Sequence, residues 1–339
     1  MNMKKVLSTV VLGAFSLSLV ACGGGGQKAQ PAQQQAEEKV YKIGIAQLVT
    51  HGALDESNRG IVDGLAAEGF VDGKNIVINQ QNAQGEQANL QTIAQQFLSE
   101  EEDLIFAIAT PTAQVMAAAT DTTPIVGTAI TSFSNAKLVE SDAHPGTNVT
   151  GTHDMTPIAE QMDLLLQILP DAKVVGTVYT SSEVNSQVQV DLMKTAAAER
   201  GLEVVETTIS TVNDIQQATQ SIVGKVDAIW LPTDNNIASA MPQLVGVCED
   251  ANKLVVCGEE SMVKAGGCIT YGINFYSIGY DAGLMAAQIL RGEAVPADMP
   301  IGDPKAEDLK LVANKAALER IGVQLPAELA ERVAYVDAE

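Results

Sequence analysis

Short apolar runs alternate with amphipathic stretches along the chain from about residue 40 to residue 291. The apolar runs are rich in β-branched residues and almost free of charge, which is typical of strands buried on both faces of a sheet. They predict strands at 42–46, 75–79, 104–109, 124–128, 173–179, 203–208, 227–231, 254–257 and 268–273. Amphipathic periodicity predicts helices at 55–69, 86–99, 111–119, 159–169, 183–200, 212–224, 236–251 and 276–291. Strands that alternate with helices indicate parallel sheets with crossover helices, an α/β fold class.

The series of elements occurs twice. The first series ends with the strand at 124–128, and after an interruption at 140–157 a second series begins at 173. Two similar Rossmann-like lobes are therefore expected. The helix at 276–291 follows the second series, and we expect it to cross back onto the first lobe.

The N-terminus has the order of a signal peptide. Lys4 and Lys5 precede an apolar run at 6–20, and a glycine run follows Cys22. The apolar run is shorter than the roughly 20 residues that span a bilayer. Because Leu-Val-Ala-Cys resembles the lipobox of bacterial lipoproteins, we expect residues 1–21 to be removed and Cys22 to carry lipid; an ordinary secretory peptide is the alternative. Residues 22–39 would form a flexible tether.

Composition narrows the possible partners. The chain of 339 residues is long enough for two domains. A net charge of −22 makes nucleic acid and anionic membrane surfaces poor partners, and we expect a monomer. The remaining cysteines, Cys248, Cys257 and Cys268, lack zinc-site spacing. Their apolar surroundings favour buried thiols, with one disulfide as the alternative.

Polar residues follow the predicted strands, at the edge where open parallel sheets bind ligands. In the first half these residues are Gln47, His51, Asn82, Thr110, Thr112 and Thr128. In the second half they are Thr180, Ser181, Ser182, Glu183, Asn185, Thr233, Asp234, Asn235, Glu259 and Glu260. Such residues also cap helices, so each has a structural alternative to ligand binding.

Sequence motifs of enzymes are missing. The sequence has no Gly-x-Gly-x-x-Gly after the first strand, no phosphate loop, no Gly-x-Ser-x-Gly and no His-Glu-x-x-His. The histidines His51, His144 and His153 are too widely spaced for a typical metal motif. We therefore expect a binding protein without cofactor or metal. A hydrolase that uses Asp234 or Glu259 as a base is a less favoured alternative.

Several short stretches resemble one family, the substrate-binding lipoproteins of ABC importers, in the branch that includes tryptophan-binding proteins. The stretches are IGIAQLVTH at 43–51, NAQGE at 82–86, ATP at 109–111, NVTGT at 148–152, PTDN at 232–235, GEESM at 258–262 and YGIN at 271–274. The resemblance covers about residues 41–300. It implies a type I periplasmic-binding fold, in which two lobes joined by three crossing segments close around an amino acid.

The resemblance also implies a location, a domain division and a partner. The protein would be lipid-anchored on the extracytoplasmic face of the cell membrane and would deliver ligand to permease subunits. Lobe 1 would comprise residues 40–150 plus 276–297, and lobe 2 residues 151–275 plus 298–339. Crossings are expected near 148–154, 270–275 and 294–302. A ligand-sensing module is the alternative, because both roles need only a closing cleft.

Ligand chemistry then suggests roles for the strand-end residues. An amino-acid carboxylate needs donors, and its ammonium needs a carboxylate, since unpaired buried charges are costly. The expected donors are Thr110, Thr128, Ser181 and Ser182. Asp234 and Glu259 are expected to bind the ammonium, with Asn82 and Asn185 as neutral partners. For an aromatic ligand, the rings of Phe133, Tyr179, Trp230, Tyr271 and Phe275 lie near the implied cleft. Tryptophan or another aromatic amino acid is the expected ligand.

Overall fold

The computed structural model describes residues 39–336 and contains two separate sheets. The first sheet has five parallel strands. In spatial order they are β2 (Ile76–Asn82), β1 (Tyr41–Gln47), β3 (Leu104–Ile108), β4 (Ile125–Ile130) and β5 (Val149–His153). The central strands β3 and β4 are buried throughout, whereas the edge strand β2 is partly exposed. The apolar runs of β3 and β4 therefore reflect their position inside the sheet.

The second sheet has seven strands and one antiparallel pairing. In spatial order they are β12 (Ala334–Val336), β11 (Lys310–Asn314), β10 (Ile269–Gly272), β9 (Leu254–Val256), β8 (Ala228–Trp230), β6 (Val174–Thr180) and β7 (Glu203–Ile209). Strand β11 runs antiparallel to β10, and the other pairs are parallel. The short strands β11 and β12 were not predicted from sequence, although the final stretch was expected to return to this lobe.

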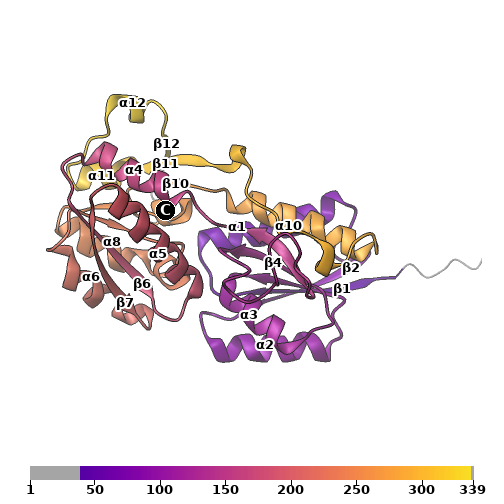
Figure 1. Cartoon of the computed structure of the whole chain (residues 1–339). Coiled ribbons are helices and arrows are strands. Elements are labelled where there is room, and N and C mark those ends of the chain that lie inside the picture. Colours follow the sequence, from indigo (N-terminus) through magenta and orange to yellow (C-terminus); the bar gives the residue numbers. More distant parts are fainter. Residues whose placement is uncertain (1–38, 337–339) are drawn as a thin grey trace, which may run out of the picture. The chain divides into compact units, whose positions relative to one another are not determined.

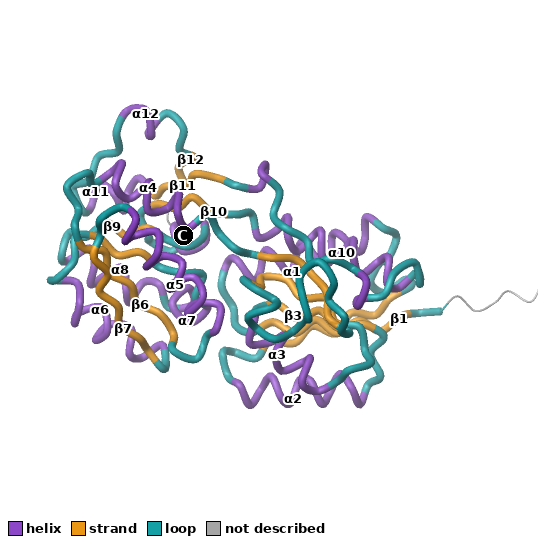
Figure 2. Tube along the Cα trace, in the orientation of Figure 1, coloured by secondary structure: helices purple, strands orange, loops and turns teal. Residues whose placement is uncertain are grey.

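Helices flank both sheets, as Figure 2 shows. The longer helices are α1 (Gly52–Ala67), α2 (Gln87–Ser99), α3 (Thr110–Ala119), α4 (Ile158–Ile168), α5 (Val184–Glu199), α6 (Ile215–Val223), α8 (Met241–Asp250) and α10 (Phe275–Leu290). The short ones are α7 (Asn235–Ser239), α9 (Glu260–Lys264), α11 (Lys315–Arg320), α12 (Ala327–Ala330), and the 3₁₀ turns η1 (Val212–Asp214), η2 (Pro296–Asp298) and η3 (Ala306–Asp308). The helix predicted at 236–251 is divided into α7 and α8, because Pro242, which has no backbone N–H, fits only the first turn of a helix that begins at Met241.

Helix α10 belongs to the first sheet although it comes late in the chain. Figure 1 shows it beside α1, coloured orange among indigo and magenta elements. Glycines bring the two backbones together: a Cβ at Gly279 would lie 2.1 Å from the Ser57 carbonyl oxygen, and one at Gly60 would lie 2.2 Å from that of Tyr276. Only glycine fits such an approach. We call the first sheet with α1, α2, α3 and α10 the first lobe, and the second sheet with its helices the second lobe.

Each lobe has its own hydrophobic core. The first core contains Phe97 and Phe106, and the second contains Trp230, whose indole N–H donates to Gln161 Oε1 at 2.7 Å. Trp230 is thus a core residue, the interpretation that its position inside a predicted strand favoured. Cys248, Cys257 and Cys268 are buried free thiols, and Cys22 lies outside the described residues.

Three segments connect the lobes, and the first is hydrogen-bonded to the third and to α10. The first is β5 and the residues after it, the second contains 273–274, and the third contains 295–302. Thr150 Oγ1 donates to the Met299 carbonyl oxygen at 2.9 Å, and Thr152 Oγ1 donates to that of Ile278 at 3.0 Å. The amide of Gly302 donates to the Gly151 carbonyl oxygen at 2.8 Å. The predicted boundary at residue 150 falls inside β5, and Phe275 and Ile301 pack in the first core.

Candidate functional site

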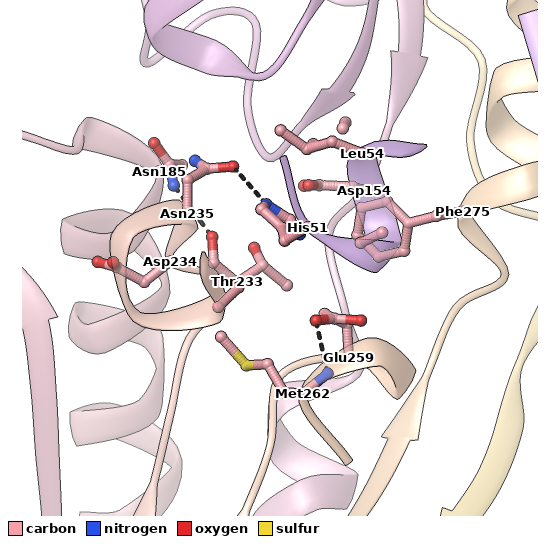
Figure 3. A pocket seen from close by; sticks show the side chains of 13 residues that line it. His51, Leu54, Asp154, Asn185, Thr233, Asp234, Asn235, Glu259, Met262 and Phe275 are labelled. Atoms are coloured by element: carbon pink, nitrogen blue, oxygen red, sulfur yellow. Dashed lines mark hydrogen bonds between the residues drawn. The ribbon is translucent and has the colours of Figure 1, made fainter. Parts of the chain in front are cut away.

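A cavity opens where strand ends of both lobes face each other. Its volume is about 10 Å³, room for roughly one water molecule, so the two lobes lie close together around it. Its lining residues are His51, Ala53, Leu54, Ala129, Asp154, Asn185, Thr233, Asp234, Asn235, Ala238, Glu259, Met262 and Phe275. Figure 3 shows their side chains, which come from the first lobe, the second lobe and a crossing segment.

Three hydrogen-bond acceptors in this lining are buried and lack a partner: Asp154 Oδ1, Asn185 Oδ1 and His51 Nδ1. The orientation of the Asn185 amide is fixed, because its Nδ2 donates to Glu183 Oε2 at 2.9 Å and to the Thr233 carbonyl oxygen at 3.1 Å. A flipped amide would place oxygen against two acceptors. Since a buried unpaired polar atom costs free energy, the lining is complementary to a molecule rich in donors.

Asp154 is the acidic group most directly available to such a molecule. It follows β5 in a crossing segment and is 3% exposed. In Figure 3 its carboxyl group points towards the cavity. Burial raises the pKa of Asp154 to about 6, while a hydrogen bond with the Thr131 side chain and the neighbouring His153 act in the opposite direction. At neutral pH the group is therefore mostly a buried carboxylate, and its Oδ1 has no hydrogen-bond partner among the described residues.

A hydrogen-bonded chain connects His51 to the second lobe. Glu183 accepts from Asn235 Nδ2 at 2.7 Å and from the Asn235 amide at 3.1 Å. Asn235 Oδ1 lies 3.2 Å from His51 Nε2. Burial and the neighbouring Asp234 raise the pKa of Glu183 above its usual value, and burial lowers the pKa of His51 to about 4. The imidazole of His51 is therefore neutral at pH 7.

Asp234 and Glu259, the expected ammonium partners, are already occupied as helix caps. Asp234 accepts from the Thr180 amide at 2.6 Å, Thr180 Oγ1 at 2.8 Å, Ser186 Oγ at 2.7 Å and the Ile237 amide at 3.0 Å. In Figure 3 its carboxylate points away from the cavity. Glu259 accepts from the Ser261 amide, from Ser261 Oγ at 2.7 Å and from the Met262 amide at 2.9 Å. The capping alternative therefore describes the geometry of both residues.

The residues that were expected to donate hydrogen bonds to the ligand carboxylate do not lie together at the cavity. Thr128 Oγ1 accepts from Thr152 Oγ1 at 2.9 Å inside the first sheet. Ser181 is exposed and its Oγ donates to the Ile209 carbonyl oxygen, and Ser182 is exposed beside it. Thr110 is buried at the start of α3, where its Oγ1 lacks a partner, but it is not a lining residue.

Three further predicted residues lie away from the cavity. Gln47 donates to Asp55 Oδ1 at 2.6 Å and to the Val49 carbonyl oxygen, which orders the loop before α1. Asn82 donates to Thr50 Oγ1 at 3.2 Å. Tyr271 lines a different pocket, together with Glu160 and Arg332. The cavity thus brings together His51, Asn185, Thr233, Asp234, Asn235 and Glu259 from the predicted set, with Asp234 and Glu259 turned to capping.

Two residues of the site were missed or undervalued in the sequence. Asp154 lies in the stretch 140–157, where the pattern of apolar runs is interrupted, so the sequence predicts no strand end before it. If Val149–His153 is recognised as a strand, Asp154 becomes a strand-end residue and a candidate for the site. Glu183 was noted only as a polar residue after a strand, yet it orients both Asn185 and Asn235.

The lobes also contact each other directly around the cavity. Gln189 Nε2 donates to Thr131 Oγ1 at 3.0 Å, and the Ala53 amide donates to Ser261 Oγ at 3.1 Å. Together with the pair of His51 and Asn235, these bonds connect the lobes on several sides of the cavity. Between residues 39 and 336, no group of three or more His, Cys, Asp or Glu side chains is placed to hold a metal ion.

Comparisons with known proteins agree with this architecture. The chain is 37% identical to the tyrosine-binding protein of Clostridioides difficile, over 99% of this chain and 97% of the relative. It superposes with a TM-score of 0.84 on a Streptococcus pneumoniae ABC domain in complex with L-Trp, at 36% identity, covering 88% of this chain and 100% of that one.

A third relative differs in conformation. A ligand-free, open substrate-binding protein with adhesive properties from Clostridium difficile gives a TM-score of 0.68 at 41% identity, again covering 88% of this chain and 100% of that one. The higher identity with the lower score shows that the present arrangement is nearer to that of the L-Trp complex.

The family assignment follows from the full length of the folded region. A family model described as ABC transporter substrate binding protein matches residues 42–336, which include both sheets and the crossing segments. Solved relatives at low identity, among them a leucine-binding protein, share the fold. The chain therefore belongs to the substrate-binding proteins of ABC transporters and has the type I periplasmic-binding fold.

Proposed function

We propose that this protein captures a single aromatic L-amino acid in the cavity between its lobes and delivers it to an ABC importer. The observation that carries the proposal is the set of unpaired acceptors in the cavity, with the buried carboxylate of Asp154 among them. An ammonium group supplies one positive charge and up to three donors, which complements Asp154 Oδ1 and Asn185 Oδ1 of this set. A ligand without a cationic donor would leave the Asp154 charge buried and uncompensated.

The α-carboxylate of the ligand would lie at the start of α1. This helix has 16 residues, and its N-cap residue, His51, makes no side-chain capping bond. Its first turn therefore offers the positive end of the helix dipole, about half an elementary charge, and backbone N–H groups other than that of Ala53, which donates to Ser261 Oγ. Ala53 and Leu54 of that turn line the cavity. Asp154 and the first turn of α1 would thus bind the two charged groups of one zwitterion.

The side chain of the ligand would meet the apolar part of the lining. Leu54, Met262 and Phe275 provide aliphatic, thioether and aromatic surface. Such surface suits an aromatic ring. The tyrosine-binding relative and the L-Trp complex support the choice of an aromatic residue.

A ligand-side experiment tests this proposal. Isothermal titration of the purified full-length protein should detect L-tyrosine or L-tryptophan, and should detect neither N-acetylated form, because acetylation removes the ammonium. A thermal melt provides a second measurement, since a ligand at 100 times its dissociation constant stabilises by about 2.7 kcal/mol. Equal binding of the free and N-acetylated forms, or no binding by any L-amino acid, would contradict the proposal.

The cellular role rests on the N-terminal segment and the family. Cys22 lies outside the described residues, and we propose that it carries the lipid that holds the protein at the extracytoplasmic face of the membrane. No helix among residues 39–336 has the length and apolarity needed to cross a bilayer. Changing Cys22 to Ser should leave ligand affinity unchanged and reduce uptake of radiolabelled ligand by cells. Unchanged uptake in cells that lack the matching permease would favour a sensor role.

A further inference from the structure

The third unpaired acceptor of the cavity, His51 Nδ1, differs in character from the other two. Its nitrogen is buried and has no partner among the described residues. It belongs to a neutral ring, whereas Asp154 provides a charged oxygen. The apolar side chains of Leu54 and Phe275 line the same cavity. An ammonium is better compensated by the carboxylate, which leaves the imidazole for a neutral donor.

The role of Nδ1 as an acceptor follows from a chain of hydrogen bonds. Glu183 Oε2 accepts from the Asn235 backbone amide, which can only donate, so this oxygen is an acceptor. The Asn235 side-chain nitrogen therefore faces Glu183, and its Oδ1 faces His51. His51 Nε2 must then carry the hydrogen, because Asn235 Oδ1 is an acceptor. In a neutral imidazole the other nitrogen has a free lone pair. Glu183 and Asn235 are therefore positioning residues that present Nδ1 to the cavity as an acceptor.

We propose, building on the amino-acid-binding function above, that His51 Nδ1 accepts a hydrogen bond from the ligand side chain and selects aromatic amino acids that carry a donor. The phenol O–H of tyrosine and the indole N–H of tryptophan are such donors, and phenylalanine has none. A ligand without the donor leaves Nδ1 buried and unpaired. We expect phenylalanine to bind roughly 10- to 100-fold more weakly than the better of the other two.

Variants of His51 test this assignment by titration calorimetry with L-tyrosine, L-tryptophan and L-phenylalanine. His51→Leu removes the acceptor, so the ratio of the phenylalanine and tyrosine dissociation constants should fall to about one. His51→Gln keeps one donor and one acceptor and should retain part of the ratio. His144→Leu is the matched control, because His144 is exposed, and it should reproduce the native ratio.

The ratio of the phenylalanine and tyrosine dissociation constants tests the role of His51, whereas binding of any of the three amino acids tests the proposed function. If His51→Leu weakens all three ligands equally, His51 serves their common ammonium or the contact between lobes, and the inference is overturned. The same holds if the native protein binds phenylalanine as tightly as tyrosine and tryptophan. If none of the three binds, the proposed function itself fails.

The tautomer provides a measurement that needs no ligand. In ¹⁵N-labelled full-length protein, two-bond correlations of the His51 ring, assigned with His51→Gln, should show hydrogen on Nε2 at pH 7. Addition of L-tyrosine should shift the Nδ1 resonance, and addition of L-phenylalanine should not shift it in the same sense. Hydrogen on Nδ1 in the ligand-free protein would overturn the inference.

Discussion

The second lobe and the segment that follows β5 both place carboxylates at the cavity, but they treat them in opposite ways. In the second lobe, Asp234 accepts four hydrogen bonds and Glu259 three, all within that lobe. Glu183 is likewise surrounded by amide donors. Asp154, in the crossing segment, keeps one oxygen buried and unpaired. An acid near a cleft is therefore not a ligand group by position alone; its unused bonding capacity decides.

The two kinds of group also have different roles: the saturated carboxylates hold the structure of the site, and the unsaturated acceptors are available to a ligand. The saturated carboxylates fix the first turns of α7 and α9 and orient the amides of Asn185 and Asn235. Two of the three unsaturated acceptors, Asp154 and His51, lie in the crossing segment and on the first-lobe side, and the third, Asn185 Oδ1, lies in the second lobe. Substitutions should therefore divide into those that affect folding and those that affect binding.

The largest effect is expected for Asp154→Asn. The amide cannot compensate a ligand ammonium, so affinity for L-tyrosine or L-tryptophan should fall roughly 100-fold, or about 3 kcal/mol. The free energy of unfolding without ligand should stay the same or rise, because a buried charge is removed. Calorimetry and urea unfolding measure the two quantities. Asp121→Asn, an exposed control, should change neither. Retained affinity in Asp154→Asn would remove Asp154 from the site.

Asp234→Asn should show the opposite behaviour. Its amide nitrogen would face donors such as the Thr180 amide, and the free energy of unfolding should fall by about 2–3 kcal/mol. Affinity for the ligand should change less than tenfold once the protein is folded. Urea unfolding and calorimetry of the same preparation compare the effects, with the exposed Asp171→Asn as control. A large loss of affinity with unchanged stability would return Asp234 to the role predicted from sequence.

Gly279→Ala should weaken the packing of α10 against α1 in the first lobe. The added Cβ would meet the Ser57 carbonyl oxygen at 2.1 Å, so α10 must move from α1, at a cost of about 2 kcal/mol in unfolding free energy. Gly246→Ala in α8 is the matched control, because a Cβ there meets nothing within 4 Å. It should stabilise by up to about 1 kcal/mol. Equal effects of the two changes in urea unfolding would show that the close approach is unimportant.

The smallest effect is a dependence of affinity on pH. Burial raises the pKa of Asp154 from 3.8 to about 6 in the ligand-free protein, and pairing with an ammonium lowers it in the complex. Protonation therefore opposes binding: affinity should be constant above pH 7 and fall by up to about tenfold per unit below pH 6. His51, with a pKa near 4, stays neutral over most of this range.

Calorimetry between pH 5 and pH 8 should show this slope in the native protein and a much smaller one in Asp154→Asn. Glu183 and Glu259 also line or support the site with raised pKa values. Their donors come from the second lobe itself, so ligand binding should change their pKa values little. An identical slope in Asp154→Asn would assign the dependence to them.

Much of the fold follows from local patterns. The buried strands β3 and β4 and the helices α1, α2 and α5 lie close to their predicted bounds, because apolar runs and amphipathic periodicity are properties of a few neighbouring residues. Strands β5, β11 and β12 were not predicted. β5 has only five residues, two of them threonine and one histidine, and its burial comes from β4 and the crossing segments. Such burial leaves no periodic signal.

The site was predictable in position but not in detail. The rule that ligands bind beyond strand ends found His51, Asn185 and Asn235, because the ends of parallel strands converge whatever the side chains are. It could not tell Asp234 from Asp154, since a helix cap and a ligand group use the same residue types. The choice depends on Thr180 and Ser186, which reach Asp234 from another strand and helix.

The sequence by itself determined the two-lobed α/β fold, the family and the edge of the sheets at which a ligand would bind, because these depend on periodicity and on short motifs. The tertiary structure decided which polar atoms remain without partners: the carboxylates of Asp234 and Glu259 are satisfied by helix amides, while Asp154 and His51 are not. Hydrogen-bond saturation is a property of groups brought together across the fold, and no single stretch of the chain contains it.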